Sequence, residues 1–323
     1  MGVLPTKQKT WQFATNLNPG LSGVDETDWD KMFLLAKNAL KGFATNAWTC
    51  VGSSDGTTAG IDATDRLTDH TKVVHSGGAH SWIALQQSQI NTNFQILFDF
   101  RLGPGDWRVY IYFSPSVGFS GGDASNRPTA ADEQAIGNDP TPLISGFSFA
   151  AQGFPCRVHA MQSTDGQSTR VFFAWGNLVR CAWFFEKPID PVTGWTNSAI
   201  ACVVAQDYAT TAFSTFYGAV WRALGPISSM PMYTIFPATH AGTVLGDGFP
   251  LPNEISAELP IYSVGLYHAD TVGQRGRHGY IADLWFTGRS ALTGTSFPSS
   301  GAKDFIVMGN MVLPWNGGNI EMG

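Results

Sequence analysis

The sequence predicts an all-β protein with a sandwich or jelly-roll-like core, one N-terminal helix and long loops. Most of the chain consists of short apolar runs that alternate with a period of two and are separated by Gly, Pro, Asn or Asp. One segment alone has the 3.6-residue periodicity of an amphipathic helix. No internal repeat of fixed length occurs, which disfavours a solenoid or a propeller.

The predicted helix lies in residues 26–42. Thr27 is a suitable N-cap, and Gly42 is placed to end the helix. Its apolar face is formed by residues spaced three and four apart: Trp29, Met32, Phe33, Ala36 and Leu40. We expect this helix to pack across a sheet.

The predicted strands follow one another at short spacing. They cover residues 80–87, 93–102, 106–115, 146–153, 156–163, 169–176, 179–188, 198–205, 213–221, 261–268 and 279–288, and an extended apolar tail begins at 305. Residues 103–106 (GPGD) form a turn, and Asp165-Gly166 is a hairpin signal.

Changes in composition and in the spacing of the predicted strands divide the chain into three parts. Residues 1–20 form an extended N-terminal arm, residues 21–205 a main β domain, and residues 206–323 a C-terminal β lobe. One continuous, elaborated domain is the alternative. Residues 1–20 and the Pro- and Gly-rich stretch 225–260 are the predicted interfaces, because loops of that length usually bind something.

Composition limits the partners. Charged residues make up 14% of the chain, against about 25% in an average soluble domain. Low charge combined with 13% aromatic residues is typical of surfaces that face other proteins. The net charge of −6 and the lack of basic clusters exclude nucleic acid as a predicted partner. No apolar stretch of about 20 residues is present, so no membrane span is predicted.

The candidate chemical sites are weak. The cysteines have no zinc spacing and are expected to be buried free thiols: Cys50, Cys156, Cys181 and Cys202. The acids and histidines of residues 62–80 lack a calcium-loop pattern. We therefore predict no metal and no cofactor.

Residues 118–122 (GFSGG) spell the G-x-S-x-G pattern of a serine-hydrolase nucleophile elbow. That elbow requires a strand directly before Ser120 and a helix directly after it. Here Ser-Pro-Ser precedes Gly118 and no helical face follows, although Asp270 and His278 lie downstream in a permissible order. We predict a glycine-rich loop, no catalytic residue and no enzyme.

Asp283 lies within the apolar strand YIADLWFTG, where a buried acid needs a donor. Arg275 or Arg277 is a candidate partner, and a structural role is favoured over catalysis. Among the tryptophans, Trp48, Trp195 and Trp315 have polar or glycine neighbours and are the predicted surface residues.

Several stretches together resemble virion structural proteins of tailed bacteriophages. They include KTWQF near the N-terminus, SPSVGFSGGDASNRPTAADE at 114–133 and RHGYIADLWFTG at 277–288, and the resemblance spans roughly residues 5–315. It implies a subunit made in the host cytoplasm and located in the virion, whose partners are other virion proteins and copies of itself.

The predicted function is a structural subunit of the tail, neck or baseplate, held by protein–protein contacts. A capsid decoration protein and a host-glycan-binding adhesin are the alternatives, the glycan being the less favoured partner. The predicted interface or ligand contacts are Trp11, Phe13, Trp195 and Trp315.

Overall fold

A computed structural model provides the three-dimensional structure. It describes residues 7–17, 36–54, 81–103, 106–122, 126–135, 156–175, 178–190, 192–194, 200–206, 215–221, 233–235, 261–270, 273–287, 296–297, 304–308 and 311–316.

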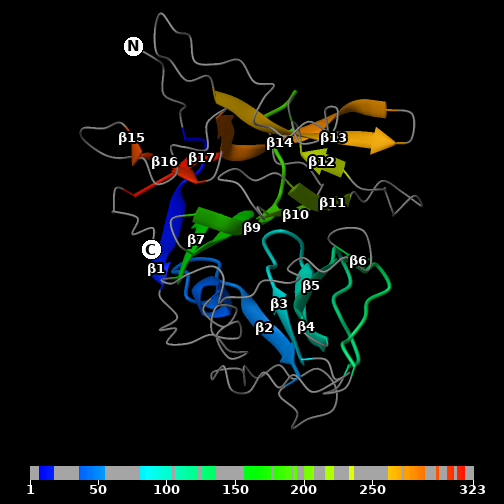
Figure 1. Cartoon of the computed structure of the whole chain (residues 1–323). Helices are drawn as coiled ribbons and strands as arrows, with labels where there is room; N and C mark the ends of the chain where they lie inside the picture. The colour runs from blue at the N-terminus through cyan, green and yellow to red at the C-terminus, as the bar shows by residue number, and fades with distance from the viewer. Residues whose placement is uncertain are drawn as a thin grey trace, which may run out of the picture.

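The protein is all-β, as predicted, and its strands form three antiparallel sheets stacked as layers (Figure 1). The middle sheet has the order β1 (Trp11–Leu17), β7 (Cys156–Ser163), β8 (Ser168–Trp175), β9 (Leu178–Glu186), β10 (Ile200–Gln206), β11 (Thr215–Trp221). The upper sheet has the order β12 (Tyr233–Ile235), β13 (Ile261–Asp270), β14 (Gly273–Thr287), β17 (Met311–Pro314), β16 (Phe305–Met308), β15 (Ser296–Phe297). The lower sheet has the order β2 (Thr49–Ser53), β3 (Ser81–Gln86), β4 (Gln95–Gly103), β5 (Asp106–Ser114), β6 (Gln134–Ala135).

The middle sheet packs against both of the others. On its lower side Trp183 of β9 stacks on Phe98 of β4, with ring centroids 4.8 Å apart. On its upper side Arg170 of β8 donates to backbone carbonyls of β14. Because side chains alternate between the two faces of a strand, a sheet covered on both faces has almost continuous apolar strands. This explains the run AWFF in β9, all of which is buried.

The lower sheet is also covered on both faces. Its outer face carries an apolar cluster of Trp82, Ala84, Leu97, Tyr110, Tyr112 and Phe119. The last member belongs to the loop that follows β5, so this loop folds back over the sheet and covers it.

The predicted helix is described at residues 36–41. Ala36 and Leu40 of its apolar face are buried. The helix ends as predicted, because the amide of Gly42 donates to the carbonyl oxygens of Asn38 and Ala39, at 2.9 and 3.1 Å. The N-cap and the first apolar residues of the prediction lie outside the described residues.

The predicted strands that fall on described residues are confirmed, and the tail beginning at 305 forms the hairpin β16–β17. The strand predicted at 146–153 and most of 225–260 lie outside the described residues. β10 ends at Gln206 and pairs with β11, so both sides of the predicted 205/206 boundary belong to one sheet. The division into domains stays a prediction.

No described helix has the length and apolar character needed to cross a membrane.

Candidate functional site

The N-terminal segment, residues 7–17, lies between the middle and upper sheets. Its strand β1 pairs with β7 of the same chain, from Trp11 opposite Ser163 to Leu17 opposite Val158, with a bulge between Ala14 and Leu17. β1 is the edge strand of the middle sheet, with β16 and β17 above it (Figure 1). We call the surface that holds this segment the docking site: the edge of β7 together with Asp165, Arg170, Asp283, Asp304 and Trp315.

Asp283 is the centre of the docking site. It lies where β14 bulges away from β13, since Ser263 pairs with Trp285 while Gly265 pairs with Tyr280. Its φ of 53° is left-handed, which Asp tolerates better than most residues. A bulge of this kind redirects a side chain out of the ladder.

The carboxylate of Asp283 accepts three hydrogen bonds from the N-terminal segment. Oδ1 accepts from the amide of Gln8 at 2.6 Å, and Oδ2 accepts from the amide of Lys9 at 2.9 Å and from the indole N–H of Trp11 at 2.8 Å. Asp283 is only 2% exposed. A buried carboxylate is stable when donors surround it, so the segment supplies what Asp283 requires.

Arg275 and Arg277 are the predicted partners of Asp283, and their side chains lie outside the described part of the chain. The three described donors come from residues about 270 positions away. A local sequence pattern contains no information about a contact of that range.

Arg170 fixes the bulge from the other side. Its guanidinium donates to the carbonyl oxygens of Ala282 and, at 2.9 Å, of Asp283, and its Nε lies 2.7 Å from Oε1 of Glu186. It also lies over the ring of Trp11, 4.4 Å from the centroid. Burial raises the pKa of Glu186, and the charge of Arg170 opposes that rise.

Two lysines attach the segment at its start. Nζ of Lys7 lies 3.0 Å from Oδ1 of Asp304, and Nζ of Lys9 lies 3.0 Å from Oδ2 of Asp165. Burial alone would raise the pKa of Asp165, but hydrogen bonds from Ser163 and the amide of Gln167, with the charge of Lys9, lower it. Positive charge on the segment therefore meets negative charge on the docking site.

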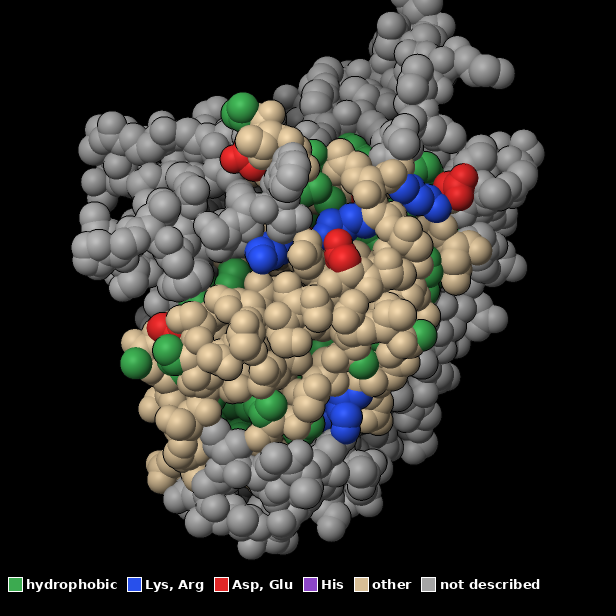
Figure 2. All heavy atoms as spheres, turned by 180° about the vertical axis from the view of Figure 1, so that it is seen from behind, with side chains coloured by type: hydrophobic (Ala, Val, Ile, Leu, Met, Phe, Trp, Pro, Cys, Tyr) green, Lys and Arg blue, Asp and Glu red, His purple; other side chains and the backbone are tan. Residues whose placement is uncertain are grey.

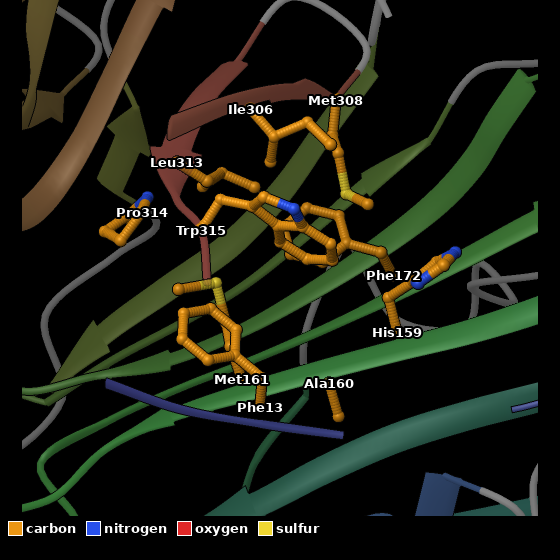
Figure 3. A pocket seen from close by; sticks show the side chains of 10 residues that line it. All are labelled: Phe13, His159, Ala160, Met161, Phe172, Ile306, Met308, Leu313, Pro314 and Trp315. Atoms are coloured by element: carbon orange, nitrogen blue, oxygen red, sulfur yellow. The ribbon is translucent and has the colours of Figure 1, made fainter. Parts of the chain in front are cut away.

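An apolar crevice continues from this point between β1, β7, β8 and the β16–β17 hairpin (Figure 3). Phe13 and Trp315 meet edge to face, with ring centroids 5.7 Å apart. The crevice has an empty volume of about 230 Å³, including the open solvent at its mouth, and nearly all its lining is apolar. This is a packing seam that the segment helps to close.

Gln12 points away from this seam. The side-chain Nε2 of Gln12 donates to the backbone carbonyl oxygen of Thr45 at 2.7 Å, and Oε1 of Gln12 accepts from the backbone N–H of Thr45 at 3.2 Å. The segment thus contacts the turn after the helix as well as the two sheets.

The structure brings three of the four predicted contact residues together. Trp11 and Phe13 lie in the N-terminal segment and Trp315 in the docking site that holds it, whereas Trp195 lies outside the described residues. The predicted surface position of Trp48 and Trp315 is wrong, because they are 2% and 4% exposed. The ring of Trp48 packs against Phe94 and Phe185, and that of Trp315 packs against Phe13.

Sequence reasoning missed Arg170, Asp165 and Asp304. Arg170 had a signal that could have found it. A lone charge within the apolar run TRVFFAW must be paired if the strand is buried.

Ser120 lies in an exposed loop, as predicted, and its backbone pairs with Thr129 in an isolated antiparallel bridge. Asp270 and the strand that carries His278 belong to the upper sheet. The middle sheet therefore separates both from Ser120.

The loop is built on its own polar residues. Asp132 accepts from the hydroxyl of Ser114 at 2.6 Å, from the hydroxyl of Ser116 at 2.7 Å, and from the amides of Ser116 and Val117 at 2.6 and 3.1 Å. Arg127 forms a two-point pair with Glu133. These side chains hold the loop on the outer face of the lower sheet.

The described residues contain no group of three or more His, Cys, Asp or Glu that could hold a metal ion. The acids and histidines of 62–80 lie outside them. Cys50 and Cys202 are buried free thiols, as predicted, and burial next to Glu186 raises the pKa of the Cys202 thiol well above its usual value.

One face of the described part of the molecule carries few charges. On the face opposite to that of Figure 1, most described atoms are backbone or uncharged polar side chains, with isolated Lys, Arg, Asp and Glu (Figure 2).

Comparison with protein-family models, with curated proteins and with solved structures finds no match to this chain.

Proposed function

We propose that the chain is a structural subunit of a tailed-phage virion, most suited to the tail, neck or baseplate, and that it assembles through protein–protein contacts. The observation that carries this proposal is the docking site. An N-terminal strand is added to a sheet edge and is fixed by backbone capture and by charge pairs, which is the chemistry of strand addition between subunits.

Two further observations support it. The charge-poor surface is suited to burial against neighbours. The polar residues of the 114–133 loop, which contribute strongly to the resemblance to virion proteins, support the loop itself. Ser114, Asp132 and Glu133 bond within the loop and hold it on the sheet.

Light scattering on the purified full-length chain tests the proposal. We expect a defined oligomer whose mass is a fixed multiple of 34.8 kDa. A monomer at every concentration up to about 1 mM, the effective concentration that a short flexible tether provides, would contradict it. Mass spectrometry of density-purified phage particles from the same source should also find peptides of this chain in a fixed ratio to the other virion proteins.

The adhesin alternative requires an exposed aromatic residue beside a carboxylate. Trp315 is buried against Phe13, so it does not supply that platform. Binding to a glycan array by a monomeric chain would nonetheless favour the adhesin.

A further inference from the structure

The N-terminal segment relates to its docking site as one chain relates to another. The side-chain hydrogen bonds described for residues 7–12 end at positions 45, 165, 280, 283, 304 and 315, and the strand itself pairs with β7. All these positions lie in the body of the protein. The contacts therefore do not depend on which chain supplies the segment.

The connection between segment and body is long. Residues 18–35 lie between β1 and the helical residues 36–41. With residues 18–25 extended and the predicted helix beginning at residue 26, this stretch spans about 40 Å. This exceeds the radius of gyration of a compact domain of this size, about 20 Å. A segment can thus reach the docking site of an adjacent copy.

An empty docking site is unfavourable. Without the segment, the carboxylate of Asp283 would lose the amides of Gln8 and Lys9 and the indole N–H of Trp11. β7 would also present an open edge. The docking site of every copy therefore needs an occupant. The copy's own segment and the segment of a neighbour can fill it with the same hydrogen bonds.

Concentration decides between the two occupants. A tethered segment has an effective concentration of about 1 mM or less, so a dilute chain binds its own. In an assembly, the docking site of a neighbouring copy lies as close to a segment as the segment's own docking site does. The segment can therefore move to the neighbour without losing any contact.

We propose that, in the assembled state, residues 7–17 of one copy occupy the docking site of a second copy. This inference rests on the proposed assembly function and specifies its partner as another copy of this chain. The bonds formed are those listed for the single chain, with Asp283 and Asp304 contributed by the receiving copy.

The experiment uses the native ion pair between Lys7 and Asp304. Their side chains are 33% and 48% exposed with the charged atoms 3.0 Å apart, so a water-soluble carbodiimide can join them directly as an amide. Full-length chains of natural and heavy nitrogen are mixed in equal amounts, dissociated in mild denaturant, reassembled and cross-linked. Mass spectrometry then reads the label on each half of the linked peptide pair.

Exchange predicts that about half of the linked pairs from the assembled fraction carry two different labels, as random mixing of two equal populations requires. The same protein cross-linked at about 1 μM should give same-label pairs, because the effective concentration of the chain's own segment then exceeds the concentration of other chains. Lys7→Gln should remove this linked pair and leave that of Lys9 with Asp165, which shows that the signal comes from the docking site.

Same-label pairs alone in assemblies would overturn the exchange and leave the proposed function standing. The absence of any assembly by light scattering would contradict the proposed function and the exchange together. No link between Lys7 and Asp304 at either concentration would contradict the docking site itself.

Discussion

Asp283 combines a left-handed backbone with a buried carboxylate, and its neighbours account for both. The bulge in β14 places the side chain against the N-terminal segment, and Arg170 binds the carbonyl oxygens of the bulge. Two amides and one indole N–H then converge on a single charged group. Charge-assisted bonds of this kind are stronger than neutral ones, so this residue should dominate the stability of the docking site.

Asp283→Asn tests this directly, because Asn tolerates the left-handed backbone but presents an NH₂ group to donors. We expect the free energy of unfolding to fall by about 2–3 kcal/mol. Urea denaturation measures the change. The matched control is Asp304→Asn, whose half-exposed ion pair with Lys7 should contribute about 1 kcal/mol or less. Equal effects from the two variants would contradict the central role of Asp283.

The lowered pKa of Asp165 allows a prediction of how the stability of the docking site changes with pH. Its pKa is lowered in the folded state, so its contribution is complete above the usual value and is lost as the pH falls through the lowered one. We expect Lys9→Gln to destabilise the protein at neutral pH and to have progressively less effect as the pH falls through the lowered pKa of Asp165, because protonation removes the charge that Lys9 pairs with. Unfolding curves at neutral and acidic pH measure this. A pH-independent effect of Lys9→Gln would contradict the pairing.

At the scale of single elements, the loop at 114–133 shows why a catalytic pattern arises without catalysis. The glycines around Ser120 meet backbone requirements. Gly118, Gly121 and Gly122 all have positive φ, and a Cβ at Gly122 would lie 2.6 Å from the backbone nitrogen of Pro128. The G-x-S-x-G pattern is therefore explained by the glycines that a tight loop requires.

Two neighbouring glycines provide a matched pair of variants. Gly121 and Gly122 have φ of 74° and 90°, yet a Cβ at Gly121 would meet nothing within 4 Å. Gly121→Ala should lower stability by about 1 kcal/mol through backbone strain alone, and Gly122→Ala by about 3 kcal/mol or more through strain and overlap. Thermal unfolding separates the two, and similar losses would show that the overlap with Pro128 relaxes.

The elements that sequence predicted well are those with local signals. Period-two alternation and turn residues located most of the longer described strands, although β2 and the short strands β6 and β12 were not predicted. A local αL residue explains the Asp165-Gly166 turn, where Gly166 has φ of 73°. The helix end at Gly42 is local too. The docking site was not predictable in the same way, because it joins residues 7–17 to positions beyond 280, and only the aromatic residues of the arm indicated that it makes contacts.

At the scale of the whole molecule, the sequence predicted the class and left the number of layers undetermined. Alternation identifies a strand with one covered face, whereas β8 and β9 are covered on both and so carry little alternation. Arg170 and Glu186 are fully buried charged residues within this apolar layer, and Arg170 joins the middle sheet to the upper one. The cohesion between these two layers should therefore depend on Arg170 and its partner Glu186.

Arg170→Met should lower the free energy of unfolding by about 3–5 kcal/mol, because it leaves Glu186 buried without its cation and two carbonyl oxygens without a donor. Glu186→Gln alone should have a smaller effect, since its amide oxygen still accepts from Nε. The loss in the double variant should be smaller than the sum of the two single losses by about 1–3 kcal/mol, because the double variant has no unpaired charge at residue 186.

The same pair predicts a pH signature with a definite sign. Burial already raises the pKa of Glu186, and removal of Arg170 takes away the main opposing charge and raises it further. A carboxyl whose pKa is raised by folding contributes stability at low pH that is lost as the pH rises through the folded value. The deficit of Arg170→Met should thus grow as the pH rises above the usual range of a glutamate and through the raised pKa of Glu186, and Glu186→Gln should abolish this growth. A deficit that is constant with pH would mean that Arg170 joins the layers through the carbonyls of β14 alone, with Glu186 playing no part.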